Sequence, residues 1–330
     1  MDQDTKRRLL TLRETDDGAR GGAANRAVSR RVVASVAALA TAFGLGTAAD
    51  AQETFLTRCG AGVHAGEGTG WVSVPQGQIF CPLAADPKAE RSFASYLRGD
   101  FATVADAPPG TTTNIAAVGL GDTFALFRFA ARRPGNGIQV DLAAAVFSHF
   151  NLDAPSFDLI NADYIVGIPL TARFAGFSAR FRVYHQSSHL GDEFLLNRQP
   201  ERVNLSFESF EAIISQELGP LRIYGGGEAF FRREPYQLPS RLVHAGGEFR
   251  PVLFGGARLL AAFDYKLVDD DTWSYGWNAR AGLELARVPS PGHPPRIISI
   301  VADWYEGTAP YGQFYRDDIR YIGVGLNLSL

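Results

Sequence analysis

The feature that most constrains this chain is a period-two alternation of apolar and polar residues that runs from Ser92 to Leu330. Between Ala257 and Leu267 every second residue is apolar, and the intervening positions include Arg258, Asp264 and Lys266. Successive side chains of a β-strand point to opposite faces, so a period of two indicates strands rather than helices. We therefore expect an all-β protein.

The alternating runs number twelve, and each is near or above the roughly 9–11 residues that a tilted strand needs to cross a bilayer. They cover 92–102, 114–130, 137–150, 158–174, 177–190, 202–218, 221–233, 241–253, 257–268, 273–287, 296–305 and 319–330. The count is even, as in bacterial single-chain barrels. This pattern predicts a closed antiparallel transmembrane β-barrel of about twelve strands. A soluble β-sandwich would also alternate, but it would not need so many strands of membrane length.

The connections between the runs fit a barrel in the outer membrane. If the first strand runs outward, four of the five periplasmic turns are short, and the outer loops are mostly longer and polar. Apolar residues alternate up to the last residue, Leu330. Seven aromatic residues at outer strand ends predict half of an aromatic girdle, namely Trp273, Trp277, Trp304, Tyr305, Tyr311, Phe314 and Tyr315.

The N-terminal region predicts export. An apolar run over 32–49 follows Arg30 and Arg31 and ends in the small residues Ala49-Asp50-Ala51. We expect residues 1–51 to be a cleaved signal peptide, with a retained single-span anchor as the alternative. Residues 52–91 would then form an N-terminal periplasmic segment, and 92–330 the outer-membrane barrel.

The two cysteines, Cys59 and Cys81, precede the first barrel strand. In an oxidising periplasm they are expected to form a disulfide outside the barrel wall, and two free thiols are the alternative. Removal of residues 1–51 takes eight basic and six acidic residues from a chain that has 32 and 35, so the remainder is acidic. A nucleic-acid partner is excluded on this balance. The expected partners are outer-membrane lipids and the barrel-assembly machinery.

The polar faces of the strands carry charges of both signs. The expected inward residues are Asp141, Arg180, Arg182, Arg222, Glu228, Glu248, Arg250, Arg258, Asp264, Lys266, Arg280, Glu284 and Asp303. Twelve strands enclose a space between that of a filled eight-strand barrel and that of an open porin. Paired charges therefore predict a lumen largely closed by its own side chains.

One strand carries polar residues on its lipid-facing side. Phe177, Phe181 and Val183 set the outward parity of 177–190, and the same parity places His185, Ser187 and His189 outward. Polar groups are costly in lipid unless they have a function there. The alternative is that these side chains lie in the headgroup zone and only hydrogen-bond water or lipopolysaccharide.

The tripeptide His185-Gln186-Ser187 resembles the His-x-Ser motif of outer membrane phospholipase A, a twelve-stranded barrel, and of the lipid A 3-O-deacylases. The resemblance implies that Ser187 is a nucleophile, that His185 is its base, and that an Asn or Glu on the next strand orients the histidine. From about Ile79 onward the chain also resembles an uncharacterised family of bacterial barrel-like domains of unknown function. That resemblance rests on 82–87, 185–193 and 202–206 and implies no activity.

The third catalytic residue has several candidates. By parity Val203, Leu205 and Phe207 would face lipid, which places Asn204, Ser206 and Glu208 inward. A bulge near Ser209 would instead turn Ser209 or Glu211 outward. Otherwise Asp192 or Glu193 would orient His185 from the loop. The orienting candidates are thus Glu193, Asp192, Asn204 and Glu208.

Two further readings concern ligands. Asp192 and Glu193 are a possible Ca²⁺ site, although two carboxylates are a weak signal. Gln186, Ser188, Asn204, Ser206 and Glu208 would form an inward cluster, which either binds a solute or is a satisfied interior network. The functional hypothesis is a lipid esterase that acts on phospholipid or lipopolysaccharide through Ser187 and His185. A structural barrel or a narrow pore is the competing hypothesis.

Overall fold

The computed structural model describes residues 69–101, 108, 110–133, 135–198, 203–254, 257–270, 273–286 and 296–329. The predicted signal peptide and Cys59 lie outside these residues. The elements are β1 (Gly70–Ser73), β2 (Ser92–Asp100), β3 (Thr112–Ala130), β4 (Gly137–Asn151), β5 (Leu159–Phe174), β6 (Phe177–Leu190), α4 (Asp192–Arg198), β7 (Leu205–Leu218), β8 (Leu221–Glu234), β9 (Arg241–Phe249), β10 (Val252–Phe254), β11 (Ala257–Val268), β12 (Ser274–Ala286), β13 (Ile297–Thr308), η1 (Gly312–Phe314) and β14 (Asp318–Ser329). Within those ranges no helix has the length and hydropathy needed to cross a membrane.

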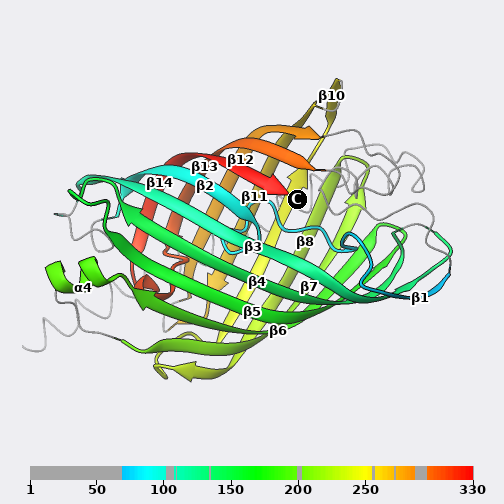
Figure 1. Ribbon diagram of the computed structural model, residues 1–330, viewed down its shortest axis with the longest axis horizontal. Coiled ribbons are helices and arrows are strands. Elements are labelled where there is room, and N and C mark those ends of the chain that lie inside the picture. The colour runs from blue at the N-terminus through cyan, green and yellow to red at the C-terminus, as the bar shows by residue number, and fades with distance from the viewer. Residues whose placement is uncertain are drawn as a thin grey trace, which may run out of the picture. The chain divides into compact units, whose positions relative to one another are not determined.

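Twelve strands form a closed antiparallel ring (Figure 1). β2 to β9 and β11 to β14 each pair with the next strand in the ring, and β14 pairs with β2 from Arg320↔Asp100 to Leu328↔Ser92. The predicted all-β, twelve-stranded barrel is therefore confirmed. Two short strands add to it: β1 pairs with β3, and β10 pairs with β11. Both lie at the opposite end of the barrel from α4 (Figure 1).

The wall has an apolar outer face and a polar inner face. On β5, for example, Val166, Ile168 and Leu170 are exposed, whereas Asp163, Thr171 and Arg173 are buried. This is the reverse of a soluble protein, and a continuous apolar outer face is stable only when lipid covers it. The chain thus has the fold of an outer-membrane β-barrel, as its sequence predicts.

The predicted inward charges do face the lumen and are paired there. Arg180 Nε donates to Glu211 Oε1 at 2.8 Å, and Arg280 Nε donates to Asp303 Oδ1 at 2.6 Å. Arg173 pairs with Glu217, and neither side chain is more than 2% exposed. Pairing offsets the cost of burying these charges and closes much of the lumen with side chains.

A loop from the N-terminal side fills the rest of the lumen. We call residues 75–91 the lumen segment. Ile79, Leu83 and Ala85 within it are fully buried. Inward side chains hold it from around the ring, in the pairs Arg128 with the carbonyl oxygens of Gln76 and Gly77, Asn278 with that of Ala85, Lys266 with Asp86, Lys88 with Asp163, and Arg182 with Glu90.

The location of Cys81 differs from the sequence-based expectation. Cys81 is disulfide-bonded, and the only other cysteine of the chain is Cys59. Cys81 is buried in the lumen rather than outside the wall. Its carbonyl oxygen accepts a hydrogen bond there from Arg222 Nη1 at 2.9 Å. One end of the disulfide is thereby fixed inside the barrel.

Apolar side chains close the mouth of the barrel at the end where α4 lies. Tyr305, Tyr311 and Phe314 were expected in the aromatic girdle, but they are buried in a cluster with Phe101 and Phe194 of α4. For these three the prediction was wrong: Tyr305 lies on the lumen-facing side of β13, and Tyr311 and Phe314 belong to the loop that carries η1, which packs into the mouth of the barrel. Trp273 and Trp304 are exposed on the wall, as a girdle requires.

Candidate functional site

The outward parity of β6 is as the sequence predicts. Tyr184, Gln186 and Ser188 are buried, while His185 and Ser187 are only partly buried on the other face. β6 ends at Leu190, three residues after Ser187. Both side chains therefore lie near one rim of the barrel, on the face that meets lipid.

His185 has a carboxylate partner on the neighbouring strand. Its Nδ1 lies 3.1 Å from Glu208 Oε1, and the two residues are direct Cα partners in the β6–β7 register. The two side chains are 41% and 24% exposed, so the contact is accessible from the lipid side. An imidazole bonded through Nδ1 keeps Nε2 free to accept a proton.

The predicted inward orientation of Glu208 and Ser206 is wrong. Along β7 the buried residues are Leu205, Phe207 and Ser209, which turns Ser206 and Glu208 outward. Leu205 and Phe207 pack inside the lumen with Tyr184, whose ring lies 5.9 Å from that of Phe207. Leu205 and Phe207 therefore belong to an apolar cluster inside the barrel, and the face of β7 that was expected to meet lipid points into the lumen.

Ser187 lies on the same face as His185. Its cross-strand neighbours are Ser206 on β7 and Tyr164 on β5. Residues i and i+2 of a strand are roughly 7 Å apart along the chain, so side-chain rotation decides whether they meet. Ser187 Oγ makes no side-chain hydrogen bond within the described part of the chain, and its hydroxyl is free to turn toward His185.

The other candidates for the third residue lie elsewhere. Asp192 and Glu193 are exposed in the first turn of α4, and Asn204 is exposed before β7 begins. Ser209 and Glu211 face the lumen, where Glu211 pairs with Arg180 and Arg182. No cluster of metal-ligating side chains occurs among the described residues, and this includes the predicted Ca²⁺ site.

The sequence did not reveal that an arginine lies beside Glu208 on the outer face of the wall. Arg232 of β8 lies opposite Glu208 in the β7–β8 register, and its Nη1 is 3.6 Å from Glu208 Oε1. The Arg232 side chain is 80% exposed. Only the register could have indicated it, since Arg232 is 24 positions beyond Glu208 in the chain.

The inward polar cluster expected from the sequence is divided between the two faces. Gln186 and Ser188 face the lumen, but Asn204, Ser206 and Glu208 do not. The Ser188 hydroxyl donates to Asp163, which also accepts from Gly312 N at 3.0 Å. This part of the cluster is a satisfied interior network, and no solute site forms from the set.

The fold defines the chain as an outer-membrane β-barrel. It belongs to the family described as "Protein of unknown function (DUF1207)", whose profile matches residues 50–330. No curated protein matches the sequence.

Solved structures with the same fold include two phospholipases. The calcium-bound dimer of the Salmonella typhi outer membrane phospholipase is 14% identical, covers 83% of this chain and 96% of its own, and has a TM-score of 0.50. An active-site mutant of Escherichia coli outer membrane phospholipase A is 12% identical, covers 84% and 98%, and also has a TM-score of 0.50. At such identities the likeness establishes the fold alone.

Proposed function

We propose that the barrel is a lipid acyl hydrolase that acts at the outer leaflet through Ser187, His185 and Glu208. The observation that carries this proposal is the 3.1 Å contact between His185 Nδ1 and Glu208 Oε1 on the lipid-facing side. Ser187 lies on the same face of β6, two residues after His185. A buried acid is not required for this arrangement, because the carboxylate serves to fix the orientation and tautomer of the imidazole.

The proposed reaction is acyl transfer in two steps. Ser187 Oγ attacks the carbonyl carbon of a lipid ester while His185 Nε2 takes the hydroxyl proton. The ester C–O bond then breaks, His185 returns the proton to the leaving alkoxide, and the acyl group stays on Ser187. Water, deprotonated by His185, attacks this acyl-enzyme, the bond between the acyl carbon and Ser187 Oγ breaks, and His185 returns the proton to Ser187 Oγ as the fatty acid leaves. Glu208 stabilises the positively charged imidazole that forms in each step.

We also propose how the chain is exported, how it is inserted into the membrane and which lipids it acts on. Residues 1–51 act as a signal peptide, the barrel-assembly machinery inserts 92–330, and the substrate is a phospholipid or lipopolysaccharide of the outer leaflet. The proposal assigns no role to Asp192 and Glu193, two exposed carboxylates that form no cluster of three or more metal-ligating side chains among the described residues.

The test is fatty-acid release from phospholipid and from lipopolysaccharide in detergent micelles, with and without Ca²⁺. Ser187→Ala is expected to abolish release while the barrel stays folded, since Ser and Ala differ little in size. The matched control is Ser206→Ala, which removes an outward hydroxyl directly across from Ser187. A fluorophosphonate probe should label Ser187 in the wild type and not Ser206. No release on either substrate, or equal release by both variants, would refute the hydrolase.

The pore hypothesis has less support than a closed structural barrel. The lumen segment crosses the barrel, and apolar residues fill the outer mouth. If hydrolysis fails, the expected result is a barrel that conducts no ions, not a channel.

A further inference from the structure

Residues 309–317, which carry η1, close the end of the barrel where α4 lies, and we call them the mouth loop. The loop is joined at its base, where Ala309 N donates to Asp317 O at 2.7 Å. Tyr311 within it is buried, and the centre of its ring lies 3.7 Å from that of the His149 ring on β4. The loop is therefore packed down onto the inner side of the wall as a lid.

One carboxylate holds both the mouth loop and the lumen segment. Asp163 on β5 accepts a hydrogen bond from Gly312 N of the mouth loop at 3.0 Å, and it forms an ion pair with Lys88 of the lumen segment. Ser188 on β6 and Asn161 on β5 also donate to this carboxylate. The Asp163 side chain is 0% exposed, so its four donors meet at a point that water does not reach.

The mouth loop fits closely over this carboxylate. A Cβ atom added at Gly312 would lie 2.5 Å from Ser188 Cβ and 3.0 Å from Asp163 Oδ1, so a side chain at this position has no room. The neighbouring Gln313 donates from Nε2 to Ser188 O at 2.8 Å and to Val203 O at 3.2 Å. These contacts hold Gly312 against Asp163 and keep the carboxylate covered.

The cover determines how firmly Lys88 is held. While water is excluded, separation of Lys88 from Asp163 would leave two buried charges without partners, which is strongly unfavourable. When the mouth loop lifts, water reaches Asp163 and solvates the separated charges, and an ion pair in water contributes little to stability. The lumen segment is therefore released much more easily with the loop open than with the loop closed.

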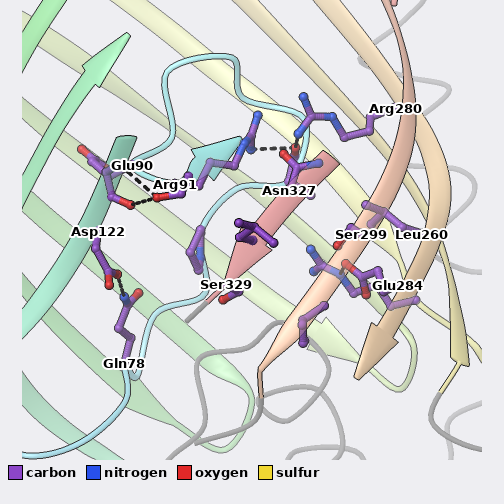
Figure 2. Close-up of a pocket in the computed structure, with 17 residues that line it drawn as sticks. Gln78, Glu90, Arg91, Asp122, Leu260, Arg280, Glu284, Ser299, Asn327 and Ser329 are labelled. Carbon is purple, nitrogen blue, oxygen red and sulfur yellow. Dashed lines mark hydrogen bonds and ion pairs between the residues drawn. The ribbon is translucent and has the colours of Figure 1, made fainter. Parts of the chain in front are cut away.

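The lumen segment also has room to move once it is released. A cavity of about 90 Å³ lies between the segment and part of the wall. Figure 2 shows Gln78 and Glu90 of the segment on one side of this cavity, and Arg280 and Glu284 of the wall on the other. Close packing would block a shift of the segment, whereas this space permits one.

From these observations we infer that Asp163 couples the mouth loop to the lumen segment, so that displacement of the loop at the mouth releases the segment inside the barrel. The segment follows β1, which lies at the opposite end of the barrel from α4, so a change at the mouth is relayed toward that end (Figure 1). Coupling is reciprocal, so loss of the Lys88 contact must also loosen the mouth loop. This inference does not depend on the proposed hydrolase, because Ser187 and His185 lie on the other face of the wall.

The test is hydrogen exchange of the full chain in detergent, followed by mass spectrometry on peptides that cover the mouth loop and the lumen segment. Lys88→Met should speed exchange in the mouth loop about fivefold or more, the lower end of the range for coupled sites. The matched control is Lys266→Met, which removes another lysine anchor of the segment, the contact with Asp86, and leaves Asp163 untouched. It should loosen the segment and leave the mouth loop at the wild-type rate.

Gly312→Ala tests the coupling in the other direction. The added methyl group meets Ser188 and should lift the mouth loop, so exchange in the lumen segment should rise about fivefold or more. In the Lys88→Met background the same substitution should add nothing to exchange in the segment, because the link is already broken. Gly225→Ala is the matched control, since a Cβ atom there lies 3.6 Å from its nearest neighbour, and it should change neither region.

Three outcomes would overturn the inference. A mouth loop that exchanges at the wild-type rate in Lys88→Met would show that the lysine does not act on the loop through Asp163. An effect of Gly312→Ala that persists undiminished in the Lys88→Met background would show that another contact carries it. Heat-modifiable migration on gels establishes that each variant is folded. If Lys88→Met does not assemble, Gly312→Ala decides alone, and an unchanged lumen segment in that variant is the third contrary outcome.

Discussion

Arg222 of β8 points into the lumen and donates from Nη1 to the carbonyl oxygen of Cys81 at 2.9 Å. The same fully buried guanidinium donates from Nε to Ser215 Oγ at 3.1 Å and lies 4.7 Å from the centre of the Phe80 ring. It joins the wall to the lumen segment next to the disulfide.

Arg222→Met should destabilise the folded barrel by about 3 kcal/mol, because removing one partner leaves buried acceptors unpaired. Urea unfolding in detergent or lipid, followed by heat-modifiable migration, measures the loss. Arg241→Met removes an exposed arginine from β9 and is expected to change little. Equal stability of the two variants would contradict the anchoring role of Arg222.

Glu208→Gln should lower hydrolysis by about 10²- to 10⁴-fold if Glu208 orients His185, as loss of the carboxylate does in Ser-His-acid triads. Labelling of Ser187 by a fluorophosphonate should slow in parallel. Glu193→Gln, in the exposed first turn of α4, is the control and should retain activity. A larger loss from Glu193→Gln would transfer the orienting role to the loop.

Replacing residues 76–90 by a Gly-Ser linker should convert a closed barrel into an ion-conducting one. These residues hold the buried side chains that fill the lumen, such as Ile79 and Leu83. Conductance across planar lipid bilayers is the measurement, with the wild type as the closed reference. If the linker variant folds but conducts no ions, the side chains of the wall close the lumen without the segment.

The loop that carries η1 should open more readily as the pH rises. Burial and the neighbouring Asp318 raise the pKa of Asp317 to about 6. The closed loop therefore favours protonated Asp317, and this stabilisation is present at pH 4 and lost as the pH rises through 6. Hydrogen exchange of residues 309–317, corrected for intrinsic rates, should be several-fold faster at pH 7.5 than at pH 4.5. Asp317→Asn should remove the difference.

The strands were predictable because lipid imposes one simple pattern on them. The run predicted over 177–190 is β6 to the residue, and that over 221–233 differs from β8 by one position. Each strand must be long enough to span and apolar on alternate positions. Those two requirements can be read from local sequence alone.

The orientation of Glu208 was not predictable, because alternation does not say which face is lipid when both faces carry apolar residues. Leu205 and Phe207 look lipid-facing, yet they pack around Tyr184 inside the barrel. Only the continuous parity of β7 down to Ile213, which is buried, places Glu208 beside His185.

The lumen segment was not predictable for a different reason. Its contacts join positions far apart in the chain, such as Arg280 and Ala84, which are 196 residues apart. The segment shows no alternation of apolar and polar residues, because its backbone bonds to side chains of the wall rather than to a neighbouring strand. Paired inward charges predicted a filled lumen, but not that an upstream loop would fill it.

The strands on either side of the lumen segment determine how it can enter the barrel. Both β1 and β2 pair with one edge of β3, so the segment between them has no free end and enters the lumen as a loop held at both ends. Its contacts reach Asn278 on β12 and Arg182 on β6, so the full set can form only once these strands have come together around it.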